Sequence, residues 1–194
     1  MALDLNLPEK KGLVVCGCYA GVGKSVVAGA VLQVLRERGI KVGVFKPVST
    51  GSKLKWSGLL ADDVDFLAEC ANTNLSLNVV NPLRYSMDGP VVVASERERQ
   101  EVDFGQIKAG YEQVCEDCDF VVVEILRGVR EPLSGAADMI DLMAEFGLPV
   151  AIVNRPDADA INSTLMTLDL LRSEKIRTAG VVLNGYDVRA ESID

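Results

Sequence analysis

Short apolar runs along the chain alternate with longer segments in which apolar residues recur every three or four positions. The runs are rich in Val and have the length of strands in a sheet that is covered on both faces. They comprise residues 13–16, 42–45, 120–123, 150–153 and 181–183. Strands that alternate with helices predict an α/β fold, a three-layer arrangement with a mostly parallel central sheet and helices on both of its faces.

The longer segments predict five helices. In the first, Val27, Val31 and Val34 form an apolar stripe, and Gly39 follows as a residue suited to a left-handed helix end. Another is preceded by Asp103, with Gln106 three residues later as a variant of the capping box. The predicted helices span residues 25–38, 62–71, 104–118, about 135–146 and 160–173.

Two further segments, residues 49–58 and 72–101, show only weak periodicity. In an α/β domain such segments often lie over the carboxyl ends of the strands, where ligands bind. Ordinary surface loops have the same pattern, so both interpretations stay open.

Length and charge limit the classes of protein to which the chain can belong. With 194 residues it has the size of one domain, and we expect a single domain over residues 1–194. The net charge of −8 argues against nucleic acid as a partner, because phosphate backbones bind clustered Lys and Arg. The sequence has neither an apolar run of about 18 residues nor a basic and apolar leader, so we expect no membrane partner and a cytoplasmic location.

Five cysteines and the absence of histidine bear on metal and acid–base chemistry. An odd number of cysteines without a framework spacing favours free thiols in a reducing compartment. A zinc site built from Cys16, Cys18, Cys115 and Cys118 is conceivable, but small buried apolar groups are the commoner role of such residues. The lack of His excludes every His-based catalytic triad.

The motif that carries chemistry is Gly21-Val22-Gly23-Lys24-Ser25, which follows the first apolar run and opens the first predicted helix. In this context a glycine-rich turn is typical of a P-loop, whose backbone N–H groups point at phosphate oxygens. Lys24 adds a positive charge, and the hydroxyl of Ser25 can bind Mg²⁺. The motif therefore predicts that these five residues bind the phosphates of a nucleotide.

One position departs from the general P-loop pattern, G-x-x-x-x-G-K-[ST]. The first Gly of that pattern falls on Cys18, whereas Gly17 stands one residue earlier. A glycine-rich turn without a ligand is the alternative, but such a turn has little use for Gly21, Gly23 and Lys24 together.

Charged residues follow other predicted strands at the same edge of the sheet. Glu124 directly follows an apolar run, so we expect it beside the phosphates as a ligand of Mg²⁺. Asp62 and Asp63 begin a predicted helix, and either could cap that helix or face the metal. Lys46 ends the second apolar run, and Thr50 follows it with a hydroxyl group.

Taken together, these residues resemble the dethiobiotin synthetases, ATP-dependent enzymes of biotin biosynthesis. The resemblance extends over nearly the whole chain and includes a glycine at the position of Gly17, so the apparent departure is a trait of the family. Its most specific part is Lys46-Pro-Val-Ser-Thr-Gly-Ser52, placed after the first helix. The other matching residues are Asp63, Asn81-Pro82, Glu124, Pro132-Leu133, Gly147-Leu-Pro-Val150, Asn162 and Ala179-Gly-Val-Val-Leu-Asn184.

The resemblance implies a dethiobiotin synthase that depends on ATP and Mg²⁺. In that reaction CO₂ carboxylates one amine of 7,8-diaminopelargonate, and the carbamate attacks the γ-phosphate to give a carbamic-phosphoric anhydride. The second amine then displaces phosphate and closes a cyclic urea. By the same resemblance Lys24 and Lys46 neutralise charge on phosphate and carbamate, and Thr50 donates a hydrogen bond to the carbamate.

The resemblance also implies the remaining site residues and a partner. Ser25, Asp63 and Glu124 would hold Mg²⁺, and Asn184 would contact the adenine. The family is dimeric, which implies a homodimer with its small-molecule substrate near the subunit interface.

Two segments differ from the usual residues of the family. Where the family has T-D-T-x, this chain has Cys18-Tyr-Ala-Gly21, and the family's E-G-A-G-G corresponds to Glu124-Ile-Leu-Arg-Gly128. Ile125, Leu126 and Arg127 add bulk where the substrate would lie. Two alternatives to the enzyme therefore stay open. One is a non-catalytic or regulatory nucleotide-binding domain of the same fold, and the other is a P-loop ATPase switch of the ParA/MinD type.

Overall fold

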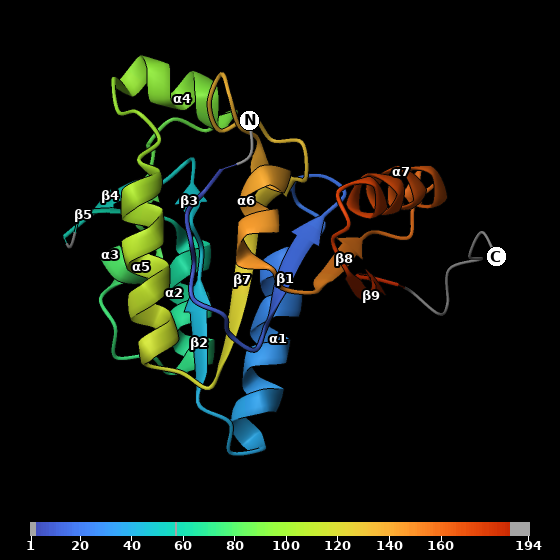
Figure 1. The fold of residues 1–194 in the computed structure, drawn as a ribbon, viewed down its shortest axis with the longest axis horizontal. Helices are drawn as coiled ribbons and strands as arrows, with labels where there is room; N and C mark the ends of the chain where they lie inside the picture. The colour runs from blue at the N-terminus through green and yellow to red at the C-terminus, as the bar shows by residue number, and fades with distance from the viewer. Residues whose placement is uncertain (1–2, 57, 187–194) are drawn as a thin grey trace.

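The computed structural model describes residues 3–56 and 58–186, and within them the central element is a parallel sheet of five strands (Figure 1). The strand order is β2-β7-β1-β8-β9. The strands are β1 (Gly12–Gly17), β2 (Val42–Phe45), β7 (Phe120–Gly128), β8 (Val150–Asn154) and β9 (Thr178–Leu183). The α/β fold with a parallel central sheet, predicted from the alternating pattern, is confirmed.

Helices cover both faces of the sheet, because successive strand residues enter two different core layers. Val14 and Val123 pack in the layer under α5 and α6, whereas their neighbours Val15 and Val122 pack in the layer under α1 and α2. Burial on both faces explains why the strands read as continuous apolar runs. The helices at the five predicted positions are α1 (Lys24–Glu37), α2 (Asp62–Ala71), α5 (Phe104–Glu116), α6 (Met139–Phe146) and α7 (Ala160–Ser173).

The order of the strands creates a switch point beside β1. β7 and β2 lie on one side of β1, and β8 and β9 lie on the other side, so the chain changes direction across β1. In open α/β sheets, ligands bind in the crevice that such a reversal opens at the carboxyl ends of the strands. The P-loop motif follows the carboxyl end of β1 and therefore lies at this crevice.

Several boundaries differ from the sequence-based predictions. β7 continues through Glu124 to Gly128, because its last residue still pairs with Gly17 of β1. α6 begins only at Met139, where Asp138 forms a capping box with Asp141. Asp103 caps α5 through the backbone N–H groups of Gly105 and Gln106, and that helix ends at Glu116.

The two segments of weak periodicity contain short elements that the sequence pattern does not predict. β4 and β5 form an antiparallel hairpin near the end of the first segment. β3, at the start of the first segment, pairs in parallel with β6 of the second segment. These elements are β3 (Val48–Ser49), β4 (Lys53–Lys55), β5 (Gly58–Leu60), α3 (Leu77–Val80), β6 (Leu83–Arg84) and α4 (Val91–Glu98). No helix in the described part of the chain is long and apolar enough to span a bilayer.

The cysteines do not converge on one site. Cys16 and Cys18 lie at the carboxyl end of β1, whereas Cys115 and Cys118 lie just before the amino end of β7, at the opposite edge of the parallel sheet. All of them are free thiols. A zinc site that uses both pairs is therefore excluded.

Candidate functional site

The loop between β1 and α1 has the backbone conformation of a phosphate cradle. Gly21 and Gly23 have φ angles of 79° and 91°, a left-handed region that residues with a side chain rarely adopt. No side chain caps the N-terminus of α1, and its first turn contains no acidic residue. Its free N–H groups and its positive dipole end are therefore available to an anion.

Contacts to two neighbouring strands hold this loop in place. Nδ2 of Asn184 donates to the carbonyl oxygen of Val22 (2.9 Å), and the backbone N–H of Asn184 donates to the carbonyl of Asn154 (2.8 Å). The Val22 side chain is fully buried, and the backbone N–H of Cys18 donates to the carbonyl of Val153 (3.2 Å). Asn184 thus braces the phosphate loop, and the adenine contact implied by the resemblance stays a prediction.

A pocket of about 420 Å³ opens between the P-loop and the carboxyl ends of β2 and β7. Of the ten residues that the sequence analysis assigned to the site, all but Val22 and Asn184 line this pocket. The lining residues from that set are Gly21, Gly23, Lys24, Ser25, Lys46, Thr50, Asp63 and Glu124. A larger hollow of about 780 Å³ lies around Lys10, Ile40 and Asp119, at the amino edge of the sheet, away from the P-loop.

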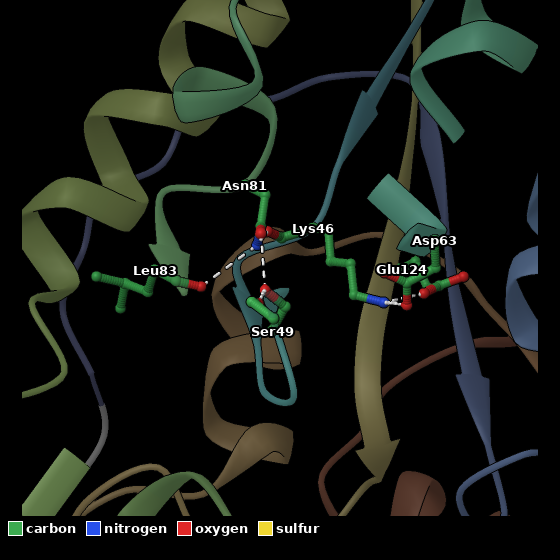
Figure 2. A network of polar contacts seen from close by, with 7 residues as sticks. Lys46, Ser49, Asp63, Asn81, Leu83 and Glu124 are labelled. Atoms are coloured by element: carbon green, nitrogen blue, oxygen red, sulfur yellow. Dashed lines mark hydrogen bonds and ion pairs between the residues drawn. The ribbon is translucent and has the colours of Figure 1, made fainter. Parts of the chain in front are cut away.

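Lys46 lies at the centre of a buried ion cluster in this pocket. Its Nζ donates to the carboxylates of Asp63 and Glu124, and the side chains of Lys46 and Glu124 are 2% and 0% exposed (Figure 2). Burial by itself lowers the pKa of Lys46, but the charges of Glu124 and then Asp63 outweigh it, so the pKa is raised. The ammonium group therefore stays charged although water hardly reaches it.

Asn81 holds the backbone from which the Lys46 side chain projects. Nδ2 of the buried Asn81 donates to the carbonyl of Lys46 (2.7 Å) and more weakly to that of Leu83 (3.4 Å). The hydroxyl of Ser49 donates to Oδ1 of Asn81 (2.8 Å). Figure 2 shows this network on one side of the Lys46 backbone and the two carboxylates on the other. The amide thus fixes the direction in which Lys46 enters the pocket.

Lys24 is a second buried cation, with different surroundings. It is 8% exposed, and burial lowers its pKa, opposed by the charge of Glu124 and reinforced by that of Lys46. Within the described residues, no carboxylate forms an ion pair with Lys24. A poorly solvated ammonium without its own counter-ion favours an anion in the pocket.

The two carboxylates also fit a divalent cation. Oδ1 of Asp63 and Oε2 of Glu124 are buried without a hydrogen-bond partner, and carboxylate oxygens are ligands that Mg²⁺ prefers. Ser25 lines the same pocket. The described residues contain no group of three or more His, Cys, Asp or Glu that could hold a metal ion by themselves, so a Mg²⁺ ion here would also need oxygens of phosphate or water.

Asp62 can be excluded as the residue that faces a metal. Its carboxylate is exposed and pairs with Lys53 (2.7 Å) and Lys55 (3.1 Å) of the β4–β5 hairpin. Neither aspartate caps α2, whose N-cap residue is Ala61. Of the two neighbours, only Asp63 belongs to the pocket.

The pocket also contains residues that the sequence analysis did not assign to binding. Leu126 and Arg127 form part of its wall, and Nη2 of Arg127 pairs with Oδ1 of Asp88 (2.7 Å). The position of Arg127 near the end of an apolar run is a signal that could have been used. Asp88 has no such signal, because it lies in a loop whose path depends on the folded structure.

Comparison with known proteins places this chain in a family. A family model described as an AAA domain matches residues 11–193. The chain is 34% identical over 182 residues to an ATP-dependent dethiobiotin synthetase of Thermodesulfovibrio yellowstonii, a match that covers 90% of this chain and 76% of that protein. The chain belongs to the dethiobiotin synthetase family. The family resemblance predicted from the sequence is thus confirmed.

A second relative agrees with this assignment, and a solved structure shares the fold. The ATP-dependent dethiobiotin synthetase of Methanococcus vannielii is 31% identical over 170 residues, which covers 88% of this chain and 77% of that protein. The kinase domain of the Escherichia coli tyrosine kinase ETK superposes with a TM-score of 0.54 at 16% identity, over 95% of this chain and 71% of that one. At that identity the likeness shows a shared fold alone. The two synthetases support an ATP-dependent enzyme.

Proposed function

We propose that the protein is an ATP- and Mg²⁺-dependent dethiobiotin synthase, which uses CO₂ to close a cyclic urea on 7,8-diaminopelargonate. The observation that carries the proposal is the buried cluster of Lys46, Asp63 and Glu124, which faces the P-loop across one pocket. Membership of the family supports this reaction over the two alternatives left open by the sequence, a regulatory domain and an ATPase switch.

The reaction develops negative charge on a carbamate and on a transferring phosphoryl group, and the pocket offers two buried cations for it. Lys24 belongs to the P-loop and suits the outer phosphates, whereas Lys46 reaches the same pocket from the end of β2. Charges fixed in a poorly solvated site stabilise a transition state without reorganisation. Catalysis by positioning and electrostatics needs no histidine, and the chain has none.

The carbamate has a further candidate donor in Thr50, whose segment is fixed by backbone hydrogen bonds. The N–H groups of Gly51 and Ser52 donate to the carbonyls of Met87 and Tyr85, both at 2.9 Å. Thr50 is thereby held at the pocket wall. We assign to its hydroxyl the hydrogen bond that orients the carbamate.

Ser25, Asp63 and Glu124 are the residues that would hold Mg²⁺, because two of them present buried oxygens without a partner. When bound, Mg²⁺ neutralises charge on phosphate oxygens. Lys46 lies between the two carboxylates and donates to both, so it holds them in place.

The direct test is formation of dethiobiotin from diaminopelargonate, bicarbonate and ATP–Mg²⁺, followed by mass spectrometry. We expect dethiobiotin to form. We expect Lys46→Met to lower kcat about 100-fold or more, which is the effect of losing one hydrogen-bond donor to a transition state. Lys53→Met is the matched control and should keep the wild-type rate, because Lys53 is exposed and its ion pair in the described part of the chain is with Asp62, outside the pocket. Tight nucleotide binding without product at saturating substrate would instead indicate a non-catalytic domain.

A further inference from the structure

Among the described non-glycine residues with positive φ, Arg127 is the one that lines the P-loop pocket. It lies near the end of β7 with φ of 55°, in the left-handed region, and its side chain forms part of the wall of the P-loop pocket. Residues held in such regions persist only where their surroundings enforce them, and they gather at ligand-binding sites. The left-handed backbone at this position therefore indicates a role for the Arg127 side chain in the pocket.

The guanidinium group of Arg127 is only partly satisfied. Its Nη2 pairs with Asp88 (2.7 Å), but its Nε is buried without a hydrogen-bond partner. The Asp88 side chain is 82% exposed, so water and salt screen this ion pair and make it weak. A buried donor without a partner is unfavourable, and an acceptor that enters the pocket would remove that penalty.

The other two cations of the pocket define what such an acceptor must be. Lys46 is neutralised by two carboxylates, whereas neither Lys24 nor Arg127 has a buried counter-ion in the described part of the chain. A planar guanidinium matches the paired oxygens of a phosphate or a carboxylate better than an ammonium does. The missing partner is therefore an anionic oxygen of a ligand.

We propose that Arg127 binds an anionic group of the ligand in this pocket and exchanges its bond with Asp88 for that contact. Two sources supply this chemistry: the terminal phosphate of ATP, and the carboxylate of the diamine substrate. The second source rests on the proposed function, and the first does not. In either case the contact with Arg127 favours ligands that carry this anionic group.

The test compares Arg127→Gly with Arg172→Ala by calorimetry. Glycine suits the left-handed backbone at position 127, so the variant keeps the fold while it loses the guanidinium. Arg172 is an exposed arginine of α7 that pairs with Asp169, which makes its variant a control for the loss of one positive charge. The titrants are ADP, a non-hydrolysable ATP analogue and diaminopelargonate, each with Mg²⁺.

Loss of a charge-assisted hydrogen bond predicts that Arg127→Gly weakens one titrant about tenfold or more relative to the control. Weaker binding of the ATP analogue with unchanged ADP assigns the contact to the terminal phosphate. Weaker binding of the diamine with unchanged nucleotides assigns it to the carboxylate. Arg127→Lys should restore part of the lost affinity, because it keeps the charge without the fork.

Affinities of Arg127→Gly that equal those of Arg172→Ala for all three titrants would overturn the proposal. This outcome is distinct from failure of the proposed function. If no dethiobiotin forms but Arg127→Gly weakens the ATP analogue, the enzyme assignment is wrong and the role of Arg127 stands.

Discussion

Asp62 and Asp63 are neighbours in the sequence, yet their side chains have different surroundings. Asp63 pairs with the buried Lys46, whereas Asp62 is exposed beside Lys53 and Lys55. We predict that Asp63→Asn raises the Mg²⁺ concentration for half-maximal ATP turnover about tenfold, because a metal ligand loses its charge. Asp62→Asn should leave the Mg²⁺ titration within about twofold of wild type. Equal titrations for the two variants would remove Asp63 from the metal site.

At the scale of single residues, the sequence identifies those site residues that belong to a motif or follow a predicted strand. Lys24 and Ser25 come from the P-loop pattern, and Lys46 and Glu124 follow apolar runs, so shared placement at one sheet edge could be inferred. The pairing of Arg127 with a carboxylate could not, because 39 positions separate the two residues and no periodic element leads to Asp88.

The phosphate loop is the element whose geometry depends most on glycine. A Cβ at Gly23 would lie 1.9 Å from Nδ2 of Asn184, the group that braces the loop, whereas a Cβ at Gly21 would meet nothing within 4 Å. Both residues have positive φ. We predict that Gly21→Ala costs about 1 kcal/mol of stability from backbone strain alone.

Gly23→Ala should cost more and should also weaken ADP binding at least about tenfold, because Asn184 must move away from the loop. Denaturant unfolding and ADP titration of both variants measure the difference. Equal losses of stability and affinity would show that the contact with Asn184 does not shape the loop.

Long elements are predictable from the sequence, and short ones are not, for a physical reason. A helix such as α1 shows several turns of periodicity, and a strand buried on both faces shows a continuous apolar run. β3 and β6 have two residues each and exist because Val48 pairs with Leu83, a contact between distant parts of the chain. The same reason explains β7, which continues past Glu124 because β1 supplies a partner.

The whole molecule should lose stability in alkaline solution because its core contains thiols. Burial, then the charge of Cys18, raises the pKa of Cys16 to about 12, and burial raises that of Cys118 to about 11. The unfolded chain releases these protons near pH 9, so between pH 9 and 11 the folded state binds more protons than the unfolded state. Stability therefore falls as pH rises through this window.

Denaturant unfolding at pH 7 to 11 measures this effect, and Cys118→Ala serves as the comparison. The variant lacks one of the thiols, so its free energy of unfolding should fall less steeply above pH 9 than that of wild type. Identical slopes would show that Cys118 does not keep its proton in the folded state.

The proposed ATP site depends on a fold that brings Lys24, Lys46, Asp63 and Glu124 to one edge of a parallel sheet, around a single pocket. Its most direct test is calorimetric titration of ADP–Mg²⁺ into wild type, Lys24→Ala and the exposed-lysine control Lys53→Ala. We predict clear binding to wild type and control, and an affinity about 100-fold lower for Lys24→Ala, because a buried charge-assisted contact is lost. Equal affinity of Lys24→Ala and wild type would contradict the assignment of the phosphate site.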